Sequence, residues 1–349
     1  MSSHIQDGRA FLERSDARYD LILFALPDSL TLVAGQSSLR LESYLFTEEA
    51  IRRASDHLQP EGVFSMYNYY RPLVFDRFAG TLDAVFGRAP CVDFGSAQGS
   101  RRQTVLTDSA DPAAVTCDAS ATWHVPAEGA PGPASDDHPF PYLRGRTIPL
   151  FYVIALLLIL LGSAIAIRAA SGPMTAMRGY VDLAFMGAAF LLLETKNVVQ
   201  FALLFGTTWF VNALVFAGIL AAVLAAVEVA RRSRLPRPRV LYAALFAALL
   251  IAWAVPPSSL LGFSVVPRFV AATALAFAPV FLANLVFAQR FRDVASSSVA
   301  FGANLLGAMV GGVLEYLALV TGYRFLLVVV GMLYALAYVA GRRVVARQR

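Results

Sequence analysis

The sequence predicts a chain of two parts: a small α/β unit followed by an all-α membrane unit of about seven helices. The mean hydropathy is +0.59 and 57% of the residues are apolar, with only 15% charged, which is the composition of a membrane protein rather than of an ordinary globular one. The acidic residues are unevenly distributed, because 19 of the 24 precede Thr147. We therefore expect an α/β domain at residues 1–126, a linker at 127–146 and a transmembrane domain at 147–349.

The elements of the α/β unit follow from apolar runs and helix signals. Residues 19–26 form an apolar run that ends at Pro27, which predicts a buried strand. Thr47 and the two glutamates after it supply an N-cap and an acidic first turn, so a helix is predicted up to about Leu58. Beyond this helix we expect a turn at 60–62, a strand at 63–70, a helix at 72–86 and an antiparallel pair at 91–94 and 103–107. This order of strands and helices is typical of the second half of a doubly wound sheet.

Seven apolar stretches follow the linker, and stretches of about 20 apolar residues mark transmembrane helices. We therefore expect a multi-pass protein of the cell (inner) membrane, with the lipid bilayer as its partner. The stretches cover approximately residues 148–168, 180–205, 208–230, 240–257, 268–288, 298–320 and 324–341.

Arginines concentrate in alternate connections: the loops at 168–179, 231–239 and 289–293, and the tail from Arg342. By the positive-inside rule these loops are cytoplasmic, and seven crossings then place residues 1–146 outside. A re-entrant second stretch would instead keep the α/β unit in the cytoplasm, so the side of this unit stays open. The net charge of +5 comes from arginines that flank the spans, and we predict no nucleic-acid partner.

Four polar residues lie at membrane depth: Glu194, Lys196, Asn197 and Glu315. Lys196 is the only lysine of the chain and shares a helix face with Gln200. We predict an ion pair between Lys196 and Glu315, which would either lock the bundle or belong to a substrate or proton path. The small residues of the segment 304–311 predict a close approach between helices, because they let two backbones come together.

The cysteines and the acidic segment within the linker carry no predicted chemistry. Cys91 and Cys117 do not form a CxxC pair, so we expect two separate structural thiols. Asp136, Asp137 and His138 are interpreted as a solvated domain junction, because the segment lacks a second group of ligands. The sequence therefore predicts no metal site.

At several points the chain resembles the spermidine synthase family, in particular its membrane-fused relatives. The resemblance runs through most of the chain, and its motifs occur in the same order. In the α/β part the matching segments are Asp7-Gly8-Arg9, Tyr19-Asp20-Leu21-Ile22, Glu42-Ser43-Tyr44 and Leu58-Gln59-Pro60-Glu61-Gly62. Residues 136–144 resemble the segment that links the two domains of the fused members, and residues 187–196 resemble a signature of their membrane half.

The resemblance implies a partial Rossmann-like, methyltransferase-type domain and a transferase activity. The family transfers an aminopropyl group from decarboxylated S-adenosylmethionine to an amine, so the implied co-substrate is that nucleoside or S-adenosylmethionine, and the implied partner is a small amine or polyamine. By resemblance, Asp7 and Gly8 contact the nucleoside and Asp28 is the catalytic base. The chain departs from the family at Ala25, which replaces a catalytic aspartate.

The glycine-rich loop of the family is also missing, which leaves the strand at 19–26 with an uncovered face. We therefore expect Met1 to be an internal start and this chain to be inactive by itself as the C-terminal portion of a longer protein, or else to receive the missing half from another polypeptide. The alternative function is a membrane transport or scaffold protein whose α/β domain is degenerate and non-catalytic. Enzyme status, acceptor and oligomeric state stay open.

Overall fold

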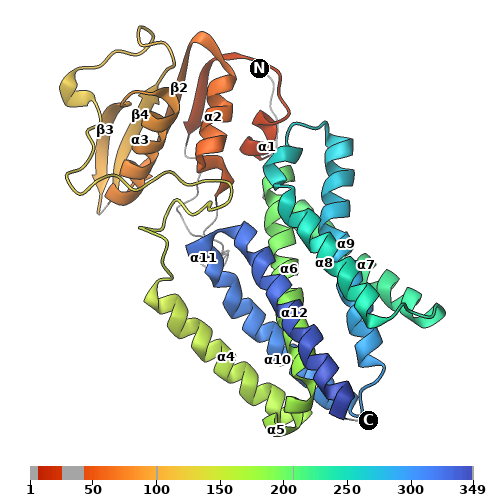
Figure 1. The fold of residues 1–349 in the computed structure, drawn as a ribbon. Coiled ribbons are helices and arrows are strands. Elements are labelled where there is room, and N and C mark those ends of the chain that lie inside the picture. The colour runs from red at the N-terminus through yellow and green to blue at the C-terminus, as the bar shows by residue number, and fades with distance from the viewer. Residues whose placement is uncertain (1–6, 26–42, 100, 207, 348–349) are drawn as a thin grey trace. The chain divides into compact units, whose positions relative to one another are not determined.

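The computed structural model describes residues 7–25, 43–99, 101–206 and 208–347. The chain divides into two compact units, Met1–Thr147 and Ile148–Arg349. The first unit holds a small mixed sheet with helices, and the second is helical (Figure 1).

In its described part, the first unit contains a four-stranded sheet in the order β1-β2-β4-β3. β1 and β2 run parallel, whereas β4 is antiparallel to both β2 and β3. The predicted alternation of strands and helices, including the closing antiparallel pair, is therefore confirmed. The elements are α1 (Gly8–Leu12), β1 (Tyr19–Ala25), α2 (Glu48–Asp56), β2 (Leu58–Tyr70), α3 (Pro72–Phe86), β3 (Cys91–Gln98) and β4 (Arg101–Asp108), with short 3-10 turns at Tyr44–Phe46 and Ala119–Ala121.

The core of this unit lies on one face of the sheet, under α2 and α3 (Figure 1). Side chains alternate between the two faces of a strand, so Ile22 and Phe24 of β1 enter the core. Phe24 meets Phe64 of β2 edge to face, with ring centroids 5.0 Å apart. Leu21 and Leu23 point to the opposite face and are about half exposed, which agrees with the uncovered face expected for this strand.

The ends of the helices have the predicted chemistry. The Thr47 hydroxyl accepts the amide proton of Ala50 and caps α2. α3 begins at Pro72 and ends before Gly87, whose φ of 75° lies in the left-handed region that favours glycine. The turn predicted at 60–62 is instead part of β2, where the pairing with β1 skips from Leu58 to Val63 as a bulge.

The second unit contains six helices that are long and apolar enough to cross a membrane, counted over the described residues. The chain is therefore a multi-pass membrane protein. A further apolar helix, α8, has only 17 residues, which is the lower limit for a span. The helices are α4 (Leu150–Ser171), α6 (Val181–Phe205), α7 (Trp209–Arg232), α8 (Pro238–Ala254), α9 (Val265–Phe291), α10 (Ser297–Leu314) and α12 (Tyr323–Arg347), with the short α5 (Met174–Met177) before α6 and α11 (Ala318–Thr321) continuing α10.

α6 is the central helix of this unit and α4 is a peripheral one. In the most apolar window of each span, 78% of the residues are buried for the span that contains α6, against 6% for α4. α10, α12, α7 and α9 all pack against α6. Because α4 exposes nearly all of its leucines and isoleucines, its surface suits lipid tails.

Small residues bring α6 and α10 together, as predicted from the segment 304–311. A Cβ atom at Gly307 would overlap the carbonyl group of Ala184, and one at Gly311 would overlap that of Ala188. The contact positions increase along both helices, so α6 and α10 run parallel. Two helices of a bundle run parallel when an odd number of crossing helices separates them in the chain. The helices between α6 and α10 are α7, α8 and α9, so the shorter α8 must also cross the bundle, where it packs against α9.

Candidate functional site

The middle of α6 carries a buried polar pair formed by Lys196 and Gln200. Both side chains are at least 95% buried, and the Lys196 ammonium group donates a hydrogen bond to the Gln200 amide oxygen. The residues are four apart, so they lie on one face of the helix as predicted. No acidic side chain forms an ion pair with Lys196 in the described part of the chain.

The predicted ion pair between Lys196 and Glu315 is wrong. Glu315 accepts a hydrogen bond of 3.1 Å from the hydroxyl of Thr195 instead. Successive residues of a helix are about 100° apart around its axis, and Thr195 is the one that faces α10. Lys196 is therefore turned away from Glu315.

The two remaining predicted residues of this segment have different environments. Asn197 is fully buried, and its amide donates a 3.0 Å hydrogen bond to the carbonyl oxygen of Ala276, which ties α6 to α9. Glu194 is partly buried and makes no hydrogen bond or ion pair among the residues that the structure describes. Glu194, Lys196 and Asn197 thus lie close together on α6, but Lys196 and Asn197 have different partners, and Glu315 reaches α6 at Thr195.

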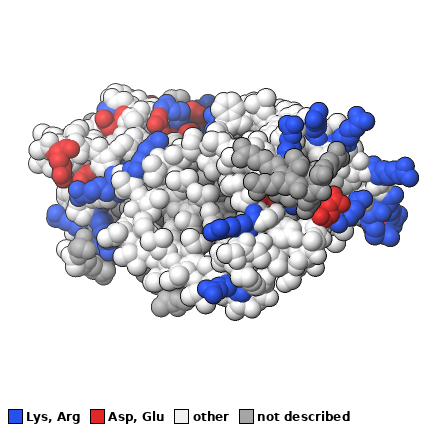
Figure 2. Space-filling model, turned by 60° about the horizontal axis from the view of Figure 1, so that its bottom comes forward, with Lys and Arg blue, Asp and Glu red and all other residues white. Residues whose placement is uncertain are grey.

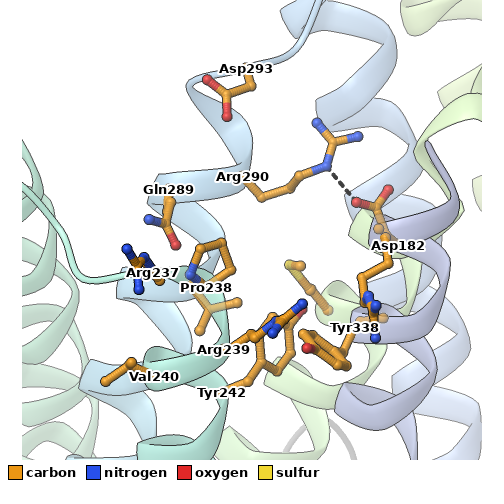
Figure 3. Close-up of a pocket in the computed structure, with 15 residues that line it drawn as sticks. Asp182, Arg237, Pro238, Arg239, Val240, Tyr242, Gln289, Arg290, Asp293 and Tyr338 are labelled. Atoms are coloured by element: carbon orange, nitrogen blue, oxygen red, sulfur yellow. Dashed lines mark hydrogen bonds and ion pairs between the residues drawn. The ribbon is translucent and has the colours of Figure 1, made fainter. Parts of the chain in front are cut away.

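A second polar cluster lies at the arginine-rich end of the bundle, where α6 begins and α9 ends. The fully buried carboxylate of Asp182 pairs with the Arg290 guanidinium at 2.5 Å, as the dashed line in Figure 3 shows. Its other oxygen, Oδ1, has no hydrogen-bond partner in the described structure. Figure 2 turns this end of the bundle toward the viewer, and blue side chains gather there with little red among them.

These residues border a cavity of about 860 Å³ between α6, α8, α9 and α12 (Figure 3). Its wall combines apolar side chains with four arginines and two tyrosines. The ring centroids of the two tyrosines, Tyr242 and Tyr338, lie 4.9 Å apart. The lining residues that carry its chemistry are Asp182, Arg237, Arg239, Tyr242, Gln289, Arg290, Asp293, Tyr338 and Arg342.

Sequence reasoning did not find this cavity. Arg237, Arg239 and Arg342 were interpreted only as topology signals, because arginine is common in cytoplasmic loops. Asp182 offered a signal, since it is an acidic residue at the start of an apolar run, two residues after the aromatic Tyr180.

The residues predicted to bind a nucleoside have local structural roles in the described part of the first unit. Asp7 caps α1 by accepting the amide proton of Ala10 at 3.0 Å. Gly8 is the first residue of α1 and lies beside Leu45. Ala25 is the last residue of β1 and is exposed, and the predicted base Asp28 lies outside the described residues.

The acidic segment of the predicted linker packs against the rest of the first unit. Asp136 accepts hydrogen bonds from Arg9 at 3.0 Å and from the Thr47 hydroxyl at 2.8 Å. Burial, together with the nearby charge of Asp136, raises the pKa of Glu49. The interpretation of Asp136 as a solvated residue is wrong, because its side chain is more than nine-tenths buried in this ion pair.

Arg77 fixes the end of the same segment. Its buried guanidinium donates hydrogen bonds to the carbonyl oxygens of Phe140, Pro141 and Arg144, at distances of 3.1, 2.7 and 3.4 Å. These bonds hold residues 140–144 against α3.

The cysteines form a disulfide rather than two separate thiols. Cys91 and Cys117 are joined although they are 26 residues apart in the sequence. The amide of Trp123 bonds to the carbonyl oxygen of Pro90, and Thr122 pairs with Cys91, so the chain after Cys117 returns to the start of β3. Neither contact has a signal in the cysteine spacing, which is why the prediction was wrong.

Comparison of the chain with protein-family models, with curated proteins and with solved structures gave no match.

Proposed function

We propose that this chain is a membrane transport protein whose solute site lies at Lys196, and that its α/β unit is not catalytic. The observation that carries the proposal is the buried Lys196 ammonium group midway along the central helix, hydrogen-bonded to a neutral amide. Charged groups at membrane depth are costly and usually mark the path of an ion, a proton or a substrate. A lysine that served only to lock the bundle would be expected to have a carboxylate partner.

The charge of the site indicates the class of solute. A small organic or inorganic anion would supply the negative charge that the surroundings of Lys196 lack, and the Gln200 amide would add a hydrogen-bond donor.

The topology also supports transport over a cytoplasmic transferase. If all seven helices cross the bilayer, the arginine-rich loops face the cytoplasm and the α/β unit lies on the opposite side. The disulfide between Cys91 and Cys117 is consistent with a location of the α/β unit outside the cytoplasm, because disulfides persist in oxidising compartments and are rare in the cytosol. A nucleoside made in the cytosol would not reach an enzyme there.

The unique lysine gives a direct test of the proposal. An amine-directed reagent can modify only Lys196 and the N-terminal amine, and peptide mass spectrometry separates the two products. In sealed membrane vesicles at mildly alkaline pH, we expect a membrane-impermeant acylating reagent to modify Lys196 from at least one side. Succinate, glutamate and phosphate are the probe anions, and a transported one should slow this modification.

The N-terminal amine is the internal control for reagent activity. If it reacts while Lys196 stays unmodified until the protein is denatured, the lysine is sealed inside the bundle. That result would leave Lys196 as a structural residue and would overturn the proposal.

A second candidate function is the transferase implied by the resemblance, with S-adenosylmethionine or its decarboxylated form as co-substrate and a small amine as acceptor. The observation that favours it is the parallel β1–β2 pair followed by an antiparallel hairpin, an order that suits the second half of a Rossmann-like sheet. Isothermal titration of the full chain with both nucleosides tests it. Binding that is lost in Asp7→Asn supports this candidate, and no heat at millimolar nucleoside rules it out.

A further inference from the structure

The cavity at the arginine-rich end of the bundle has two chemically different parts. Its inner wall is apolar and includes Met186, Val286 and Ala337 from three different helices. Its rim is basic, and Arg290 reaches across it to Asp182 while Arg239 lies beside the rings of Tyr242 and Tyr338 (Figure 3).

The rim has excess positive charge. The charge of Arg290 is neutralised by its ion pair with Asp182. Arg237, Arg239 and Arg342 then face the single carboxylate of Asp293, so the rim keeps a net charge of about +2. A ligand that fits both parts carries an anionic head and an apolar tail.

We propose that this cavity binds the phosphate group of an anionic phospholipid, with the acyl chains lying along the apolar wall. The cavity lies at the ends of four membrane helices, on the side where the arginine-rich loops place the bilayer interface. Basic pockets between transmembrane helices are suited to such headgroups, because arginine binds phosphate oxygens in a forked geometry. This proposal does not depend on the transport of a solute at Lys196.

Asp182 is one of the lining residues, but its Oδ1 atom is inaccessible to solvent, so the headgroup contacts come from the arginines of the rim. Phosphatidylglycerol is therefore used as a probe for anionic phospholipids in general. Gly341 also lines the cavity, and a Cβ there would lie 3.4 Å from Asp182 Oδ2.

The test compares two variants with the same change of net charge. In R237Q/R239Q/R342Q, three arginines of the rim are neutralised; in R231Q/R232Q/R234Q, three exposed arginines of the same end are neutralised outside the cavity. Each purified full chain is titrated in a neutral maltoside detergent with phosphatidylglycerol, phosphatidylmethanol, phosphatidylcholine and inorganic phosphate. The apparent dissociation constant is taken from the rise of the thermal unfolding midpoint with ligand concentration.

We expect phosphatidylglycerol to stabilise the unmodified chain and phosphatidylcholine to have little effect. The rim variant should bind phosphatidylglycerol about 100-fold more weakly, since each arginine beside an anionic headgroup contributes about fivefold. The control variant should retain nearly full affinity. Phosphatidylmethanol has the same charge on its phosphate, so it should bind about as tightly as phosphatidylglycerol.

Three results would overturn the proposal. Equal losses in the two variants would mean a diffuse attraction to the whole basic end. Stabilisation by inorganic phosphate as strong as that by lipid would assign the cavity to a soluble anion. No stabilisation by any anionic ligand, in a chain whose circular dichroism shows intact helices, would leave the cavity without this function.

Discussion

The ion pair between Asp182 and Arg290 gives the sharpest prediction about the stability of the bundle. Asp182 is fully buried, the Arg290 side chain is only 15% exposed, and the contact measures 2.5 Å. Arg290→Gln removes the cation and leaves a carboxylate whose other oxygen already lacks a partner in the described structure. Breaking one side of a buried pair costs about 3–5 kcal/mol. Because the Arg290 side chain keeps some contact with solvent, we expect the lower end, about 3 kcal/mol.

Removing both charges should cost less than removing the cation alone. In R290Q/D182N no buried charge is left uncompensated, so we expect a loss of about 1–2 kcal/mol, in the range of a lost hydrogen bond. Unfolding by increasing mole fractions of dodecyl sulfate in mixed micelles, followed by circular dichroism, measures each free energy. Arg231→Gln is the matched control, since Arg231 pairs with Glu228 on the exposed surface, and no measurable change is expected. A loss below about 1 kcal/mol in R290Q, or a double variant at least as unstable as R290Q, would refute this reasoning.

Three further predictions concern other parts of the structure. Gly307→Leu should separate α6 from α10 and lower stability by at least about 1–3 kcal/mol, whereas Gly331→Leu, at a position with open space, should be tolerated in the same micelle assay. C91S/C117S should lower the stability of the first unit by about 3.5 kcal/mol, because the disulfide no longer restricts the unfolded chain. Reductant should cause the same loss in the unmodified chain. Unfolding is followed by the fluorescence of Trp123, after the two membrane tryptophans have been replaced by phenylalanine. Burial raises the pKa of Asp108 above its ordinary value of 3.8, so the folded state binds a proton more readily than the unfolded one. Stability should therefore fall as pH rises from about 4 through the raised pKa. Urea unfolding at several pH values should show a smaller decline in Asp108→Asn than in the unmodified chain, and the raised pKa of Glu49 accounts for the remainder.

Much of the fold could be predicted from local signals. The bounds of α3 follow from Pro72 at its start and Gly87 after its end, because these residues are suited to those positions by backbone geometry alone. The spans follow from length and hydropathy, and Gly307 and Gly311 predict that another helix comes close to α10, although they do not say which one.

Contacts between distant segments were harder to predict. Helical periodicity showed that Lys196 and Gln200 share a face, but it could not say which neighbour that face meets, so Glu315 was paired with the wrong residue. The disulfide depends on a loop that returns to β3, and nothing in the spacing of Cys91 and Cys117 indicates that return. The cavity at the arginine-rich end draws its residues from four helices and the loops beside them, and each of these segments has an ordinary loop or span sequence by itself.

The side of the membrane that the α/β unit occupies is the measurement that tests a transport protein against a cytoplasmic transferase most directly. Cys91 and Cys117 are the only cysteines of the chain, so they report this side without any engineering. Sealed right-side-out vesicles are treated with a membrane-impermeant phosphine and then with a maleimide polymer that shifts the band on a gel. We predict a shift only after reduction, because the transport proposal places the disulfide outside. Thiols that are free without reductant and react only after the vesicles are opened would place the unit in the cytoplasm and contradict the transport proposal.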